Sequence, residues 1–227
     1  SESSKASESS KASESSKASE SSKASESSKA SESSKASESS KARESSKARE
    51  SSKKDQVMFD PRLLVGKVGL NRIMTFDDGG STSTRSNFEY RDESKYGRIF
   101  SPDEIGKYSA KIKNICNNVI DSTGLILVYS QYIDGGLVPI ALALEELGLT
   151  RTGDVKSLFK TPPTEKIDAI TFKSKDKMEE KGKFKQATYA MITGDKSLSP
   201  NNAEELKRVT DPDNKDGSKV KIVLISQ

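Results

Sequence analysis

Three short groups of polar residues follow apolar segments of this 227-residue chain, each where a buried strand is expected to end. Hydroxyl groups, side-chain amides and the backbone amides beside a glycine can all donate hydrogen bonds to phosphate oxygens. Contacts of this kind hold a nucleic-acid backbone without reading its bases. The candidate binding residues are Tyr129, Ser130, Gln131, Thr193, Gly194, Ser226 and Gln227.

The sequence lacks the residues that many enzymes need. It contains no histidine, which excludes Ser-His-Asp hydrolysis, Cys-His catalysis and His-Glu zinc proteases. Gly66-Lys67 does not fit a phosphate-binding loop, which has four residues between its two glycines and a Ser or Thr after the lysine. Asp77-Asp78 leads into a Gly-Gly turn and does not fit a Walker B site. We therefore predict no catalytic residue, no metal site and no ATP hydrolysis by this chain alone.

The polar groups must be positioned by strands, and three apolar segments predict them. Residues 125–128 form a short apolar run that is typical of a strand covered by helices on both faces. Residues 188–193 and 219–225 predict two more strands. Because helical segments separate the three, they are expected to pair in parallel through right-handed crossovers. The fold class is therefore α/β, and all three polar groups would lie at one edge of the sheet.

Three helices are predicted around these strands. Ser101-Pro102-Asp103-Glu104 has capping-box spacing, and an apolar stripe follows it to a helix end near Gly124. Cys116 lies on this stripe and is interpreted as a small core residue rather than a nucleophile. A second helix occupies residues 137–147, and a third, begun by Ser199-Pro200, occupies residues 201–209.

Two other segments carry weaker signals. Residues 54–100 have scattered apolar positions and a turn-rich stretch, so we expect an irregular approach segment with one short element at most. Residues 150–187 are interpreted as an insertion with a flexible basic surface. Acidic residues dilute its lysines, so a solvated surface is favoured over a basic binding patch. The lysines are Lys173, Lys175, Lys177, Lys181, Lys183 and Lys185.

The first 53 residues repeat a six-residue unit, Ser-Glu-Ser-Ser-Lys-Ala, with Arg in the first position at Arg43 and Arg49. The unit has no side chain larger than Ala that could enter a core, so nothing offsets the conformational entropy lost on ordering. We expect residues 1–53 to be a disordered Ser-rich repeat tail. It can serve as a solubilising spacer or be the product of a repeat expansion.

Charge and hydropathy limit the partners and the location. The tail holds nine Glu, nine Lys and two Arg, which leaves 27 basic and 25 acidic residues in the remainder of the totals of 38 and 34. This balance argues against a dedicated high-affinity phosphate binder. No segment reaches the roughly 20 apolar residues that span a bilayer, and the amino terminus has no apolar signal region. Together with the single cysteine, this predicts an intracellular protein without a membrane partner.

Several of these motifs resemble the second RecA-like domain of superfamily 2 helicases. The closest likeness is to the helicases of large nucleocytoplasmic DNA viruses, related to the poxvirus early-transcription-factor ATPase. The motifs are Tyr129-Ser130-Gln131, Asp134-Gly135-Gly136, Thr193-Gly194-Asp195 and Ser226-Gln227, in that order, and residues 101–113 resemble the preceding helix. The likeness covers about half of the chain.

The resemblance implies that residues 101–227 form an incomplete second RecA-like domain that contacts nucleic-acid backbone. It assigns Tyr129, Ser130 and Gln131 to helicase motif IV, places Thr193 and Gly194 at the next strand end, and starts motif V at Ser226. The arginine-bearing motif VI is absent, so the chain resembles a fragment. In the complete parent helicase a first RecA-like domain would bind ATP and Mg²⁺. The location implied is the cytoplasm of an infected cell, or the virion.

A second hypothesis is a non-catalytic α/β domain that binds another protein through an uncovered edge of its sheet. Nearly neutral charge and the missing motifs favour it. An exposed strand edge invites pairing with another chain. The sequence leaves both hypotheses open, as well as the choice between RNA and DNA.

Overall fold

The chain divides into two units, residues 1–52 and residues 53–227. A computed structural model describes residues 65–79 and 83–227 of the second unit. The predicted tail, residues 1–53, and the first part of the predicted approach segment lie outside the described residues.

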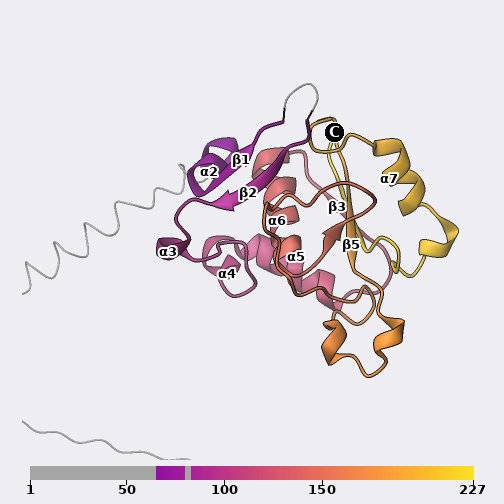
Figure 1. The fold of residues 1–227 in the computed structure, drawn as a ribbon. Coiled ribbons are helices and arrows are strands. Elements are labelled where there is room, and N and C mark those ends of the chain that lie inside the picture. Colours follow the sequence, from indigo (N-terminus) through magenta and orange to yellow (C-terminus); the bar gives the residue numbers. More distant parts are fainter. Residues whose placement is uncertain (1–64, 80–82) are drawn as a thin grey trace, which may run out of the picture. The chain divides into compact units, whose positions relative to one another are not determined.

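A four-stranded parallel sheet forms the centre of the second unit (Figure 1). Its strands are β3 (Ile126–Tyr129), β4 (Thr150–Arg151), β5 (Thr188–Ile192) and β6 (Ile222–Ile225). They lie in the order β3-β6-β5-β4, and every neighbouring pair is parallel. The predicted α/β class with a parallel sheet and flanking helices is confirmed.

Helices cover the two faces of the sheet unequally. On one face lie α5 (Ala110–Asp121) and α6 (Val138–Glu146), which pack with β5 and β6 into the main core. On the other face α7 (Asn202–Val209) packs through Val209 on Ala190 and Val223. Figure 1 shows α7 across the sheet from α5 and α6. The small second cluster comes from β5, β6, α7 and Val220, which lies just before β6.

The edge strand β3 is therefore exposed on the face that carries α7. Ile126 and Val128 pack against the main core, but the side chain of Leu127 is 64% exposed and that of Tyr129 is 55% exposed. The prediction that helices cover both faces of residues 125–128 was wrong, because no helix among the described residues covers the face that carries Leu127 and Tyr129. Helix α7 lies over β5 and β6, and β3 is one strand further out.

The approach segment is more regular than predicted. It contains α2 (Gly66–Ile73), an antiparallel hairpin of β1 (Met74–Asp77) and β2 (Ser86–Tyr90), and the short α3 (Glu93–Tyr96). The rings of Phe76 and Phe88 stack with their centroids 4.5 Å apart. The buried side chains of Leu70, Met74, Phe88 and Phe100 belong to the main core. The expectation of an irregular segment was wrong because these apolar residues come together only through the hairpin.

The helix predicted from residue 102 is divided. Residues 101–104 form turns, α4 spans Ile105–Tyr108, and α5 begins after Ser109. Ser109 has an extended backbone, with φ −149° and ψ 97°, and its hydroxyl accepts a hydrogen bond from the amide of Ile112. This capping bond starts α5 anew, so Ser101 does not cap the long helix.

The segment 150–187 packs onto the domain at several points. It contributes β4, the buried side chains of Leu158 and Ala169, and the 3₁₀ turns η3 (Lys175–Lys177) and η4 (Lys181–Lys183). The carboxylate of Glu145 accepts hydrogen bonds from the amides of residues 158 and 159, at 2.8 and 2.9 Å. Burial raises the pKa of Glu145. The six lysines predicted to be solvated are exposed.

Across residues 65–79 and 83–227, no helix combines the length and the apolar character needed to cross a membrane.

Candidate functional site

The structure brings the three predicted strand ends together. Tyr129 and Ile192 both pair with Ile225 in neighbouring strands. The amide of Ser130 donates to the carbonyl of Ile225, and the amide of Ser226 donates to that of Ile192, each at 3.1 Å. We call the region formed by residues 129–132, 193–199 and 226–227 the carboxyl edge. The expectation of one shared edge is confirmed by this register.

A side-chain hydrogen-bond ring holds the first loop of the carboxyl edge. The Ser130 hydroxyl accepts from the amide of Tyr132 at 3.2 Å and donates to its carbonyl at 3.0 Å. The chain then enters a π-helical turn, η2 (Ile133–Leu137), which leads into α6. A Cβ atom at Gly136 would lie only 2.3 Å from the Ser130 hydroxyl oxygen. Glycine at this position therefore leaves the space that the Ser130 hydroxyl occupies.

The second loop is held by Thr193 and Ser199, which are both buried. Their hydroxyl oxygens lie 2.8 Å apart, and the Ser199 hydroxyl accepts from the amide of Thr193 at 3.0 Å. The Thr193 hydroxyl also accepts from the amide of Asp195 at 3.1 Å. Both hydroxyls are thus used within the loop. The prediction that Ser199 begins the following helix was wrong, because α7 starts at Asn202 and Ser199 bonds back to the strand end.

A buried arginine, Arg151, also contacts the second loop. Nη2 of Arg151, at the end of β4, donates to the carbonyl of Leu198 at 2.7 Å. It also lies 3.6 Å from Oε1 of Glu205 on α7. The other oxygen of Glu205 accepts from the amide of Met191 at 2.6 Å. These contacts join β4, β5 and α7 and give the second loop a rigid support.

Arg85 joins the two loops and was not anticipated from the sequence. Its side chain is 8% exposed, and its guanidinium pairs with the carboxylate of Asp134 in η2 and, at 3.3 Å, with that of Asp195. The amide of Arg85 donates to the carbonyl of Ser197 at 2.8 Å. Arg85 lies just before β2, so the hairpin supplies a cation that pairs with two acidic residues beside the carboxyl edge.

The pKa of Asp195 is shifted by competing effects. Burial acts to raise it, but hydrogen bonds from the hydroxyl and amide of Ser197, together with the charge of Arg85, hold the pKa below its usual range. Asp195 is therefore ionised near neutral pH and stays bonded within its own loop. It is not a free acceptor or a general base at the carboxyl edge.

The predicted site residues differ in accessibility. Tyr129, Gln131, Gly194 and Gln227 are exposed at the carboxyl edge, and Ser130 is half-buried in its hydrogen-bond ring. Thr193 is 3% exposed and Ser226 is 8% exposed, so both lie mainly within the fold. Two exposed neighbours were missed, Tyr132 at 65% and Lys196. Their proximity to the predicted strand ends was a signal that could have identified them.

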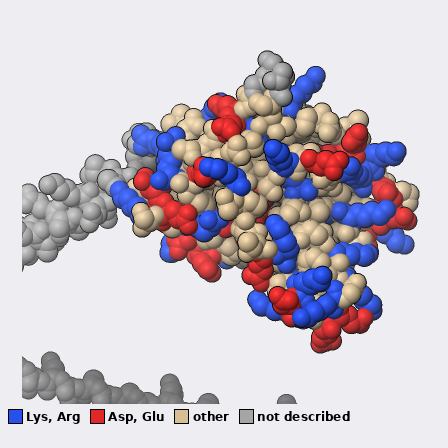
Figure 2. Space-filling view, in the orientation of Figure 1, with Lys and Arg blue, Asp and Glu red and all other residues tan. Residues whose placement is uncertain are grey.

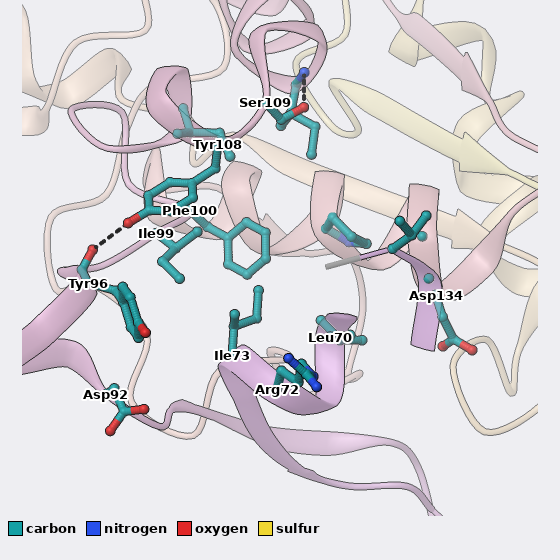
Figure 3. Close-up of a pocket in the computed structure, with 16 residues that line it drawn as sticks. Leu70, Arg72, Ile73, Asp92, Tyr96, Ile99, Phe100, Tyr108, Ser109 and Asp134 are labelled. Atoms are coloured by element: carbon teal, nitrogen blue, oxygen red, sulfur yellow. Dashed lines mark hydrogen bonds between the residues drawn. The ribbon is translucent and has the colours of Figure 1, made fainter. Parts of the chain in front are cut away.

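A cavity of about 430 Å³ lies behind the first loop (Figure 3). Its apolar lining includes Leu70, Ile73 and Phe100, and Asp134 lies at one end in Figure 3. Arg72 and Asp92 also line it. The cavity can admit an apolar group, but its two exposed charges have opposite signs and do not select the charge of a ligand.

The described residues contain no group of three or more His, Cys, Asp or Glu side chains placed to hold a metal ion. Burial raises the pKa of the Cys116 thiol to about 11, as expected for a cysteine that packs in the core.

No model of a known protein family matches the sequence. The comparison with curated proteins likewise found no significant match.

Proposed function

We propose that residues 65–227 act as a nucleic-acid-binding α/β module of the helicase type, which contacts a strand through the carboxyl edge. The carrying observation is that three polar strand ends lie side by side on β3, β6 and β5. In open α/β sheets, ligands bind outside the carboxyl ends of the strands. The exposed side-chain amide of Gln131 and the exposed backbone of Gly194 suit phosphate oxygens.

ATP hydrolysis is not assigned to this chain alone, because neither Walker sequence occurs in it. ATP and Mg²⁺ would belong to a separate RecA-like domain, as would the strand movement of a complete helicase. A viral origin and an infected-cell location belong to the same proposal and derive from the sequence resemblance.

The charge of the surface predicts weak binding. In Figure 2, basic and acidic side chains alternate over the visible face without forming a large field of one sign. At the carboxyl edge, the single positive charge of Arg85 pairs with Asp134 and Asp195 and so reduces, without cancelling, the repulsion that the two carboxylates would exert on phosphate. Affinity that depends on a few phosphate contacts falls as salt is raised.

The test is titration of a fluorescein-labelled 20-nucleotide single strand, read by anisotropy at low and high salt. We expect weak binding at low salt that is reduced at high salt. Gln131→Ala should weaken it roughly 3- to 10-fold through loss of a hydrogen bond to phosphate. Asn117→Ala on the exposed side of α5 is the matched control and should have no effect. Absence of binding at both salt concentrations contradicts the function, and an unaffected Gln131→Ala variant contradicts the site.

A second candidate function is protein binding at β3, as the uncovered-edge hypothesis proposes. The specific observation is that β3 ends the sheet, while Leu127 and Tyr129 are exposed on one of its faces. Such a strand can pair with a strand of another chain. Light scattering across a concentration series tests self-pairing, which Leu127→Lys should abolish. A monomer at every concentration contradicts pairing between copies of this chain.

A further inference from the structure

Two tyrosines at the carboxyl edge are exposed and unpartnered. Tyr129 is 55% exposed and Tyr132 is 65% exposed, whereas large apolar side chains are mostly buried elsewhere in the domain. Within residues 65–79 and 83–227, neither ring stacks on another ring or cation, and neither hydroxyl makes a hydrogen bond. Exposed aromatic rings with no intramolecular partner are typical of surfaces that bind a planar group.

The backbone that carries these rings is rigid. Tyr129 is paired with Ile225 in the sheet, and the Ser130 hydroxyl bonds both the amide and the carbonyl of Tyr132. Little backbone freedom would be lost when a ligand stacks on either ring, which favours binding. Three residues span at most about 11 Å, so the Cα atoms of Tyr129 and Tyr132 lie close enough for one short stretch of a strand to reach both residues.

The carboxyl edge carries an exposed basic side chain that can contact a phosphate group. Arg85 occupies the carboxylates of Asp134 and Asp195, and Lys196 is exposed in the second loop. No ion pair involves Lys196 among the residues that the structure describes, so its ammonium group is available for phosphate. Single-strand binding grooves combine basic side chains with stacking aromatic rings, and Lys196 belongs to the same carboxyl edge as the two tyrosines.

We propose that Tyr129 and Tyr132 form a stacking platform for the unpaired bases of a single-stranded nucleic acid. The inference rests on the proposed function and extends it from backbone contact to base stacking. A duplex cannot use the platform, because its bases are stacked on each other and paired. The platform therefore selects single strands without reading their sequence, since every base has a face that can stack.

The experiment compares three labelled probes with the full chain at one salt concentration. They are a 20-nucleotide single strand, an abasic strand with the same number of phosphates, and a duplex of the same sequence. We expect the single strand to bind at least roughly 5- to 150-fold more tightly than the abasic strand, which is the gain from stacking one base at about 1–3 kcal/mol. The abasic strand should retain the weaker backbone binding.

Variants assign the difference to the two rings. Tyr129→Ala and Tyr132→Ala should each remove much of the preference for the base-bearing strand, while binding of the abasic strand is unchanged. Tyr129→Phe and Tyr132→Phe keep the ring and should bind like the wild type. Ile170→Ala, at a side chain that is 51% exposed and belongs to the segment 150–187, is the control for loss of exposed apolar surface. Because both tyrosines are exposed, the melting temperatures should be preserved.

A second readout reports stacking directly. The chain contains no tryptophan, so Tyr129→Trp or Tyr132→Trp introduces a single indole at the platform. Its emission should be quenched by the base-bearing strand and unaffected by the abasic strand. Unquenched emission with saturating single strand overturns the platform even if binding occurs.

The outcomes distinguish base stacking from the backbone contact of the proposed function. Equal affinity for the base-bearing and abasic strands overturns base stacking and leaves the proposed backbone contact standing. Failure of all three probes to bind overturns both. If no probe binds and Tyr129→Ala instead abolishes self-association, the platform is a protein interface and the nucleic-acid assignment is wrong.

Discussion

Nη2 of Arg85 lies 3.3 Å from Oδ2 of Asp195, although 110 residues separate these two side chains in the sequence. The same guanidinium reaches Asp134, so one cation from the hairpin joins both loops of the carboxyl edge. The contact is mostly shielded from water, because the Arg85 side chain is only 8% exposed. It ties the approach segment to the candidate site and sets the local charge there.

Arg85→Met is expected to lower the free energy of unfolding by about 1–3 kcal/mol, because two partly buried carboxylates lose their counter-ion. It should also weaken oligonucleotide binding, since the freed carboxylates repel phosphate. Chemical denaturation and anisotropy measure the two effects. Adding Asp134→Asn and Asp195→Asn should restore part of the affinity. Arg72→Met, at an exposed position, is the matched control, and an equal effect of both single substitutions would contradict the role of Arg85.

Gly136→Ala is expected to disturb the first loop. The new Cβ would lie 2.3 Å from the Ser130 hydroxyl oxygen and 3.2 Å from its Cβ, so the Ser130 ring must open or the π-helical turn must shift. We expect a loss of about 1–3 kcal/mol in unfolding free energy, as for other overpacked sites. Gly182→Ala is the control, because a Cβ there meets nothing within 4 Å. If the melting temperature of Gly136→Ala were unchanged, the first loop would accommodate the methyl group without loss of stability, which contradicts the prediction.

Lys221→Met is expected to stabilise the protein. The Lys221 side chain is nearly completely buried, and its ammonium donates to the carbonyl of Ser122 at 3.2 Å and lies 5.4 Å from the ring centroid of Phe172. Burial lowers the pKa of Lys221, and nearby Asp216 opposes this shift only in part. Replacing the ammonium by an apolar side chain of similar length should add about 1–2 kcal/mol at neutral pH.

The pH dependence gives this prediction a second measurement. Because the folded-state pKa of Lys221 is below its unfolded value, the ammonium costs stability at neutral pH. The cost falls as pH rises through the folded pKa toward the ordinary lysine value of about 10.4. The advantage of Lys221→Met should therefore shrink in alkaline denaturation experiments. Lys215→Met, at an exposed neighbouring position, should show neither the gain nor the pH dependence.

Asp168→Asn is expected to loosen the segment 150–187. The carboxylate of Asp168 accepts from the amides of Ile170, Thr171 and Lys185 at 2.8–3.0 Å, and also from the Thr171 hydroxyl. Asparagine keeps only one acceptor oxygen, so its amide nitrogen must face either the Lys185 amide or the donors of residues 170 and 171, and the variant should lose about 2–4 kcal/mol of unfolding free energy. Asp176→Asn, whose side chain is 94% exposed, should be neutral.

Acid titration tests the same carboxylate. Burial acts to raise the pKa of Asp168, but the hydrogen bonds outweigh burial and lower it below the usual value. The stability it supplies is complete above the unfolded pKa of about 3.9 and is lost as pH falls toward the folded pKa. The stability difference between wild type and Asp168→Asn should shrink in that range, and a constant difference would contradict this explanation.

Local patterns predicted the parallel sheet well. The apolar run at residues 188–193 and the helix signals at 201–209 depend on neighbours only a few positions away, which a sequence displays directly. The start of α5 was misplaced, because Ser109 was read as part of a continuous helix although its side chain caps a new one. Ser199 was assigned as a helix cap, but its side chain bonds back to Thr193, just after β5, instead of to the helix that follows.

The sequence by itself determined that polar residues end three strands and that these ends share one edge, because parallel pairing follows from the alternation of strands and helices. Only the tertiary structure decided which of these residues a ligand can reach. The strand order makes β3 the outer strand and exposes Tyr129, while the second loop buries Thr193. Accessibility and the charge supplied by Arg85 depend on contacts between residues far apart in the chain, and no local pattern encodes those contacts.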